Sequence, residues 1–380
     1  MKMQMQPMRI LPPADKTACR MWELDHGHVW IIDDALQLPP PPLSNSLCGM
    51  LTAFARFADG KISRETTPEA LTRALMDPQA RLWLDMESPS AEELSLLEKV
   101  FHFHPLAIED ATHRAQRPKL ENYTQVADVC QHGYYYMVIH GPDLETFKEH
   151  LQTKELDNFF SDRYLVTVHE KRMQSIEEVR NRAEGDADPM LERGIDWILY
   201  LILDHLVDSC IPILDYLEVE LDTIEEEALT NPTPDLLVRI AGKKRELLNF
   251  RRNIGPQREV IAQLTRGEVP FIRENVRIYF RDVQDHLIRT VEMVELYRDL
   301  IMGARDIYLS SVSNHLNQIM KTLTIISVIA MPIMVVTSFF GMNFENMPAI
   351  HSPRGFWVTI AFTAVFEVLV ICLIKWKGWL

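Results

Sequence analysis

One line of polar and small side chains runs along an expected helix near the C-terminus. Steps of four and three residues, which stay on one face of a helix, lead from an aspartate to a glycine without meeting Leu, Ile, Val or Phe. We name this line the seam; it consists of Asp306, Ser310, Ser313, Asn317, Met320, Thr324, Ser327, Met331, Met334, Ser338 and Gly341. Hydroxyl and amide oxygens on one helix face could line a wet path for a hydrated cation.

Two interpretations of the seam compete. Helices that pack closely in a membrane also enrich Gly, Ser and Thr, but that packing does not predict Asn317 or the three methionines. A coiled-coil seam would carry apolar residues instead. The pattern therefore favours pore-lining helices. Two spans per chain cannot enclose a pore, so a homo-oligomer is expected.

Two segments are long and apolar enough to cross a membrane. Residues 322–344 hold no charge, and residues 355–374 hold one, Glu367; at 1.5 Å per residue they reach about 34 and 30 Å, against a hydrocarbon core of about 30 Å. No stretch before Thr322 is comparable. We expect Glu367, which is costly in lipid, to face a protein neighbour or to lie near the inner end.

Lysines set the expected orientation of the two spans. Lys321 precedes the first span, Lys375 and Lys377 follow the second, and the connecting loop has only Arg354. Because basic residues stay on the cytoplasmic side, both termini are expected in the cytoplasm. The chain would then be a multi-pass protein of the cell (inner) membrane, with lipid as a partner.

The rest of the chain divides by composition. Residues 1–48 indicate an extension with a proline run at Pro39–Pro42 and a strand at Val29–Ile32, and residues 49–170 an α/β domain. In that domain Ser90 and Glu93 predict a capping box at a helix start. Strand-like runs lie at 51–57, 82–86, 125–129, 134–139 and 164–168.

Long helices are expected after the α/β domain. Residues 171–321 predict a helical stalk region with breaks at 231–234, at 255–256 and at 267–270. From Pro270 to Pro332 no proline intervenes, which allows a helix of about sixty residues, roughly 90 Å long. The order is completed by the first span at 322–344, an outer loop at 345–354, the second span at 355–374 and a basic tail at 375–380.

The charge balance excludes several classes of partner. A net charge of −15 argues against nucleic acid, which needs a basic face, and favours cations. No P-loop, dinucleotide fingerprint or nucleophile elbow is present. We therefore expect neither an enzyme nor an ATP-driven pump.

A short motif stands at the outer end of the first span. Gly341-Met342-Asn343 is followed by Phe344-Glu345-Asn346-Met347-Pro348, behind a large acidic domain. Further stretches are His104–Asp110 (HPLAIED), Gln116–Lys119 (QRPK), Tyr308–Asn314 (YLSSVSN), Met320–Ile326 (MKTLTII), Met331-Pro332 and the C-terminal Gly378–Leu380 (GWL). Over residues 49–380 the chain resembles the CorA family of magnesium and cobalt transporters.

That resemblance implies a fold and roles for particular residues. The fold would be a funnel-shaped homopentamer with a cytoplasmic α/β domain, long stalk helices and two C-terminal transmembrane helices. Gly341, Met342 and Asn343 would form the selectivity filter, with Glu345 as the only acid of the outer loop. The seam would line the pore, with Asn317 at the inner mouth, Met320 and Met331 at constrictions and Asp306 at the entrance. Asp110 and Asp282 would meet between subunits and hold a regulatory Mg²⁺.

The implied activity is passive, divalent-cation transport gated by cytoplasmic Mg²⁺. Mg²⁺ is the expected ion, with Co²⁺ and Ni²⁺ as lesser substrates. Oxygen ligands suit Mg²⁺, and the seam carries no Cys or His, which zinc favours. Two alternatives remain: a zinc transporter resembling the ZntB branch of the same superfamily, and a membrane-anchored scaffold that conducts nothing.

Overall fold

The computed structural model describes residues 20–24, 27–31, 49–113, 116–123, 133–342 and 352–379. The chain separates into two compact units, Met1–Cys48 and Gly49–Leu380. The first contains a hairpin of two antiparallel strands, β1 (Arg20–Leu24) and β2 (Gly27–Ile31). The strand predicted at 29–32 overlaps β2 for most of its length, whereas β1 was not predicted from the sequence. The proline run lies outside the described residues.

A seven-stranded sheet forms the centre of the second unit, in the order β4-β3-β5-β9-β8-β7-β6. Only β5 and β9 run parallel among neighbouring strands. The strands are β3 (Met50–Arg56), β4 (Ile62–Ser63), β5 (Arg81–Glu87), β6 (Lys119–Asn122), β7 (Tyr135–Pro142), β8 (Thr153–Phe160) and β9 (Tyr164–His169). Four predicted strands are confirmed as β3, β5, β7 and β9. The fifth, at 125–129, falls outside the described residues.

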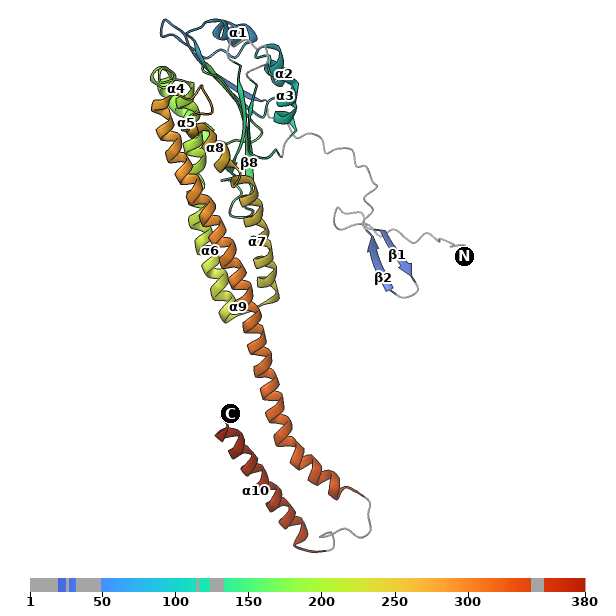
Figure 1. Ribbon diagram of the computed structural model, residues 1–380. Coiled ribbons are helices and arrows are strands. Elements are labelled where there is room, and N and C mark those ends of the chain that lie inside the picture. The colour runs from blue at the N-terminus through green and yellow to red at the C-terminus, as the bar shows by residue number, and fades with distance from the viewer. Residues whose placement is uncertain are drawn as a thin grey trace. The chain divides into compact units, whose positions relative to one another are not determined.

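Helices cover both faces of this sheet, so its strands are buried on two sides. On one face lie α1 (Pro68–Met76), α2 (Ala91–Lys99) and α3 (Pro105–Thr112), which enclose an aromatic cluster around Phe103 and Phe159. The capping box at the start of α2 is confirmed. The other face packs on α4 (Gln174–Glu192) and α5 (Ile195–Asp208) (Figure 1).

The remaining helices are built round one long helix, α9. They are α6 (Ile211–Thr230), α7 (Pro234–Ile254), α8 (Gln257–Arg266), α9 (Glu274–Phe340) and α10 (Gly355–Trp376). The predicted breaks at 231–234, 255–256 and 267–270 are confirmed as the junctions α6–α7, α7–α8 and α8–α9. The long helix has 67 residues, about 100 Å, and continues through Pro332.

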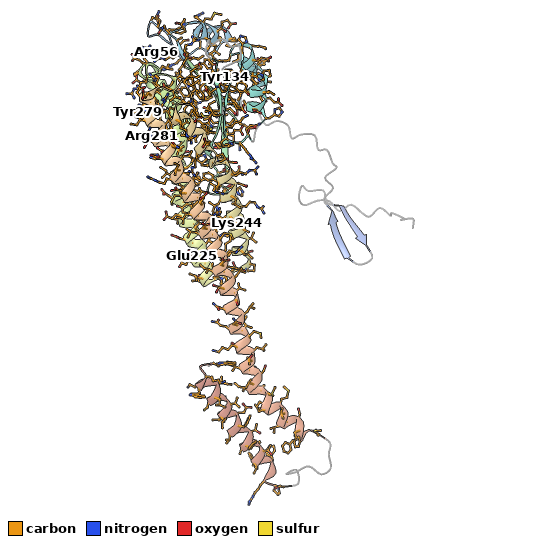
Figure 2. The ribbon with its side chains drawn as sticks, in the orientation of Figure 1. Arg56, Tyr134, Glu225, Lys244, Tyr279 and Arg281 are labelled. Atoms are coloured by element: carbon orange, nitrogen blue, oxygen red, sulfur yellow. The ribbon has the colours of Figure 1, made fainter. Side chains whose placement is uncertain are left out.

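Burial divides α9 into two parts. Its last buried residue is Tyr308. Figure 2 shows α6, which carries Glu225, and α7, which carries Lys244, beside one part of α9; below the lower ends of α6 and α7, α9 continues without them. Beyond that point α10 is the one described element beside it; it runs antiparallel, and the Lys321 ammonium donates to the Gly378 carbonyl (3.3 Å). The most apolar stretch of 18 residues has a mean hydropathy of 2.3 in α9 and 2.4 in α10. No part of either stretch is buried inside the protein.

Candidate ion pathway on helix α9

The seam occupies one exposed face of α9. Every seam residue from Asp306 to Gly341 is exposed in the single chain. The partly buried residues of the apolar part form a different line, which we name the inner stripe: Ile325, Ile329, Pro332 and Val336. At 100° per residue, the seam lies roughly 150° round the helix from the inner stripe. Since α10 is the neighbour in this part of α9, the seam faces away from α10 and is free to face other copies.

Two seam hydroxyls are bonded to the helix itself. The Thr324 hydroxyl donates to the Met320 carbonyl (2.7 Å) and the Ser327 hydroxyl to the Leu323 carbonyl (2.9 Å). With its proton directed along the helix, each oxygen keeps lone pairs as an acceptor. An acceptor suits the water shell of a cation, because the hydrogens of that shell point outward.

The acidic end of the seam is partly compensated. The guanidinium of Arg305 contacts the Asp306 carboxylate at 2.8 Å, and both side chains are well exposed. A pair of this kind in water contributes little and exchanges readily. Asp306 is therefore available to a passing cation, although with less attraction than an isolated carboxylate would give.

At the other end of the seam α9 stops at the predicted motif. The amide of Gly341 donates to the Thr337 carbonyl (3.0 Å) and caps the helix, and Met342 follows with its side chain about half exposed. Asn343 and Glu345 lie outside the described residues. The structure thus places two of the three expected filter residues directly at the helix end.

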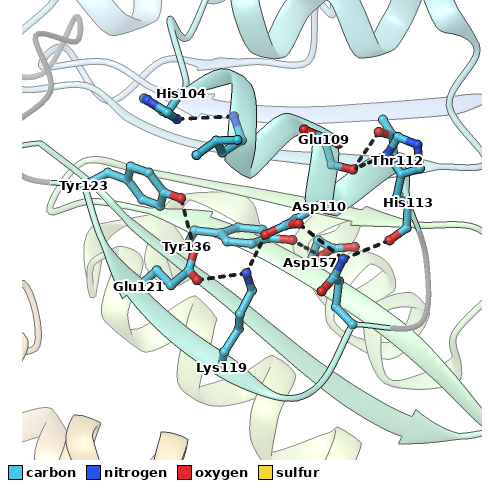
Figure 3. Close-up of polar contacts among 12 residues, drawn as sticks. His104, Glu109, Asp110, Thr112, His113, Lys119, Glu121, Tyr123, Tyr136 and Asp157 are labelled. Atoms are coloured by element: carbon cyan, nitrogen blue, oxygen red, sulfur yellow. Dashed lines mark hydrogen bonds and ion pairs between the residues drawn. The ribbon is translucent and has the colours of Figure 1, made fainter.

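Asp110, one of the two expected regulatory carboxylates, already has partners within its own chain (Figure 3). It lies on α3, where it accepts from the Lys119 ammonium (2.5 Å) and the Gln116 side-chain amide (3.2 Å). Burial lowers the pKa of Lys119, but its bonds to Asp110 and Glu121 outweigh this and raise it overall. Burial and a bond to Glu121 raise the pKa of Tyr123 to about 12. Asp110 is thus held by a charged lysine.

Asp282, the other expected regulatory residue, is exposed on α9 beside an acidic group of α5. Burial, then Asp208 and also Asp282, raise the pKa of Asp204. His286 contacts Asp208 at 2.9 Å. His205 works against the rise in the pKa of Asp204, so two histidines accompany the acids of this face. Among the described residues no group of three or more His, Cys, Asp or Glu could hold a metal ion.

The comparisons with known proteins agree with this geometry. A family model described as a CorA-like Mg²⁺ transporter protein matches residues 78–375. The putative metal ion transporter YfjQ of Bacillus subtilis is 36% identical over 297 residues, 78% of this chain and 89% of that protein. The chain belongs to the CorA family. The cobalt/magnesium transport protein CorA of Thermotoga maritima is 34% identical, over 74% of this chain and 78% of that protein.

Solved structures of CorA proteins share the fold. The complete CorA magnesium transporter from Methanocaldococcus jannaschii matches with a TM-score of 0.73 at 25% identity, over 87% of this chain and 99% of that one. The full-length CmaX protein matches at 0.67 and 21% identity, a likeness of fold alone. The CorA fold class predicted above, an α/β domain followed by a long helix and a C-terminal apolar helix, is confirmed.

Sequence reasoning missed three features of this CorA chain. It did not pair Asp110 with Lys119, although both stand in motifs it singled out. It did not see that Asp204 and Asp208 share a face with Asp282; their spacing of four residues on one helix was the available signal. It also did not expect that α5 and α6 contain a stretch of 18 residues as apolar as a membrane span, with a mean hydropathy of 1.6. Of this stretch, 56% is buried inside the protein.

Proposed function

We propose that this chain forms a homo-oligomer, a pentamer by family resemblance, that conducts Mg²⁺ passively across the cell (inner) membrane. The observation that carries the proposal is the position of the seam on α9, opposite the side that holds α10. With α10 outside and the seam inside, several α9 helices can surround a path lined by hydroxyl, amide and thioether groups. The magnesium transport named for the relatives supports the same ion.

The orientation and the ion range complete the proposal. Both termini lie in the cytoplasm, and the loop 345–354 faces outside. Neutral oxygen acceptors at Asn317 and Asn343 hold Mg²⁺ through its waters, strongly enough to admit it and weakly enough to release it. Co²⁺ and Ni²⁺ follow the same path less well. Zn²⁺ is disfavoured, because the seam offers it no Cys or His.

Gating by cytoplasmic Mg²⁺ is the finer part of the proposal, and it centres on Asp282. Its neighbours Asp204 and Asp208 add to the local negative charge, so a bound cation relieves repulsion within one subunit. Asp110, compensated by Lys119, contributes less. Few charged ligands make the site weak, in the range of about 10⁻⁴–10⁻³ M.

One liposome assay with the purified full-length protein tests both parts. Uptake of Mg²⁺, Co²⁺ and Zn²⁺ is compared for the parental chain, Asn343→Ala and the matched control Asn346→Ala. We expect Asn343→Ala to assemble normally and to lose most Mg²⁺ flux, and the control to keep it. Asp282→Asn should blunt inhibition by internal Mg²⁺ more than Asp110→Asn does.

Three outcomes would contradict the proposal. Parental Mg²⁺ flux in a correctly assembled Asn343→Ala variant would remove the filter role. Zn²⁺ uptake exceeding that of Mg²⁺ would favour the zinc transporter, and no flux of any ion would favour a scaffold. Unchanged inhibition in Asp282→Asn would remove that residue from gating.

A further inference from the structure

Helices α6 and α7 carry charges of opposite sign on surfaces that no described part of the chain covers. On α6 this surface holds acids and apolar residues but no base. We name it the acidic face; it consists of Asp215, Glu218, Val219, Asp222, Glu226 and Leu229, all of them exposed. The corresponding surface of α7, the basic face, holds no acid. It consists of Leu237, Val238, Lys244, Arg245, Leu248 and Arg252, of which Lys244 is partly buried and the others are exposed.

The charges of these two faces are not compensated within the chain. In the part of the chain that the structure describes, no acid of the acidic face and no base of the basic face has an ion-pair partner. Glu218, Asp222 and Glu226 stand four residues apart, and like charges at this spacing on a helix repel each other. A helix face that meets only water usually mixes both signs. One sign on each of two helices therefore indicates that each face has a counterpart.

The two faces point out from opposite sides of the pair that α6 and α7 form. Within one chain Arg239 contacts Glu227 (2.6 Å) and Lys243 contacts Glu220 (2.9 Å), so the two helices lie side by side. At 100° per residue, the centre of the acidic face lies about 140° round α6 from these paired acids. The centre of the basic face lies about 160° round α7 from the paired bases. One copy therefore cannot bring its own two faces together.

The two faces also stand at matching heights. The helices run antiparallel (Figure 1), and the two ion pairs between them show which levels lie side by side. By that register Arg245 is level with residues 218–221, between two acids of the acidic face, and Leu237 is level with residues 226–229, which end at Leu229. A rotation about an axis normal to the membrane keeps these levels. They therefore also hold between α6 of one copy and α7 of the next.

We propose that the acidic face of α6 packs against the basic face of α7 in a second copy of this chain. Each copy offers a different face to each of its two neighbours, so the contact is heterologous, and its repetition closes a ring. The bases of the neighbour relieve the repulsion along α6, and the exposed leucines and valines between the charges leave the water. The contact rests on the homo-oligomer proposed above and adds which surfaces join the copies away from the membrane spans.

Cross-linking of the full-length protein in liposomes tests the contact. Leu229→Cys and Leu237→Cys are combined in a chain without the native cysteines, and a short bismaleimide is added. Linked chains should run on a denaturing gel as a ladder of dimers, trimers and larger species, and neither single variant should give linked chains. Dimers from Leu229→Cys alone would mean that two acidic faces meet, and a link confined to one chain would mean that the faces meet within a copy. Either result would overturn the contact.

Light scattering of the same protein in detergent separates this contact from the homo-oligomer itself. An assembled oligomer that gives no ladder would overturn the contact of α6 with α7 and leave the homo-oligomer intact. Monomers throughout would overturn the homo-oligomer and the contact together.

Charge reversal tests whether the attraction holds the two faces together. Asp222→Arg should raise the protein concentration at which half of the chains are assembled by about tenfold, because it sets like charges against each other. Arg245→Glu should act in the same way, and the double variant should recover most of the loss. Glu98→Arg, the same kind of change at an exposed acid of α2, is the control and should leave assembly unchanged. Single variants that assemble like the control, or a double variant weaker than either single variant, would overturn the pairing.

Discussion

Helix α5 and helix α10 are both rich in apolar residues but have opposite surroundings. The segment 195–230, which begins with α5, contains a window with the hydropathy of a membrane span, as α10 does, yet 56% of the first window and none of the second is buried inside the protein. In α5, Leu199 has no exposed surface and belongs to the hydrophobic core; in α10, Leu369 is 54% exposed. Apolar composition therefore indicates that a helix must be covered, and only the tertiary structure tells by what.

Buried acids differ between the same two regions. In the α/β domain Asp85 is fully buried, with His169 at 3.2 Å, Arg180 at 3.5 Å and the Thr167 hydroxyl at 2.6 Å. In α10 both carboxyl oxygens of Glu367 are buried, and neither has a hydrogen-bond partner among the residues that the structure describes. Where the chain covers its own apolar surface, it supplies counter-charges to a buried acid. Where the chain leaves its apolar surface uncovered, the acid finds no such partner within the described part of the chain.

The largest expected difference is between two identical substitutions. Leu199→Ala should lower the free energy of unfolding by about 2–5 kcal/mol, through lost burial and a cavity. Leu369→Ala should change it by about 0.5 kcal/mol or less, as at exposed positions. Chemical denaturation of the purified chain, followed by tryptophan fluorescence, measures both. A cost at Leu369 equal to that at Leu199 would break the comparison, since it would mean that another protein surface covers α10.

A smaller change in the free energy of unfolding is expected at Asp85, the buried acid of the α/β domain, when its partner His169 loses its proton. Burial lowers the pKa of His169, but Asp85 outweighs this and raises it overall. Both ring nitrogens lie against acceptors, Nε2 at Asp85 and Nδ1 at the Lys171 carbonyl (2.8 Å), as suits the protonated ring. The stabilisation is therefore fully present below the unfolded pKa of about 6.5 and is lost as pH rises through the raised, folded value.

His169→Gln should remove that pH dependence. We expect the parental protein to lose about 1.5–3 kcal/mol, the contribution of a charge-assisted hydrogen bond, as pH rises above 6.5, and the variant to lose much less. Thermal unfolding across a pH series measures this. His150→Gln, at an exposed histidine, serves as the control. Parallel pH curves for the parental protein and His169→Gln would show that His169 is neutral throughout.

The features predicted from sequence are those that neighbouring residues determine. The capping box of α2, the helix breaks and the seam all depend on short spacing. Strand β8 was not predicted, because Lys154, Asp157 and Asn158 give it a polar composition. These residues are buried through partners far along the chain: the Lys154 ammonium lies 3.0 Å from Asp143, and the Tyr136 hydroxyl donates to Asp157 (2.6 Å).

In the candidate site, too, the sequence predicts what nearby residues determine and misses contacts between distant elements. The seam could be predicted, since it repeats along one helix, but the lysine that compensates Asp110 and the acids that surround Asp282 come from other elements.

The smallest effect concerns a feature that four consecutive residues determine. In α2 the Ser90 hydroxyl accepts from the Glu93 amide (3.3 Å), and the Glu93 carboxylate accepts from the Ser90 amide (2.7 Å). Ser90→Ala removes one half of this box and should cost about 1 kcal/mol. Ser95→Ala, on the same helix, is the control: its hydroxyl bonds only the Glu92 carbonyl (2.7 Å), and alanine has the higher helix propensity, so the change should be neutral or slightly stabilising. Equal costs for the two serines, measured by denaturation, would mean that packing on the sheet, and not the local sequence, decides where α2 begins.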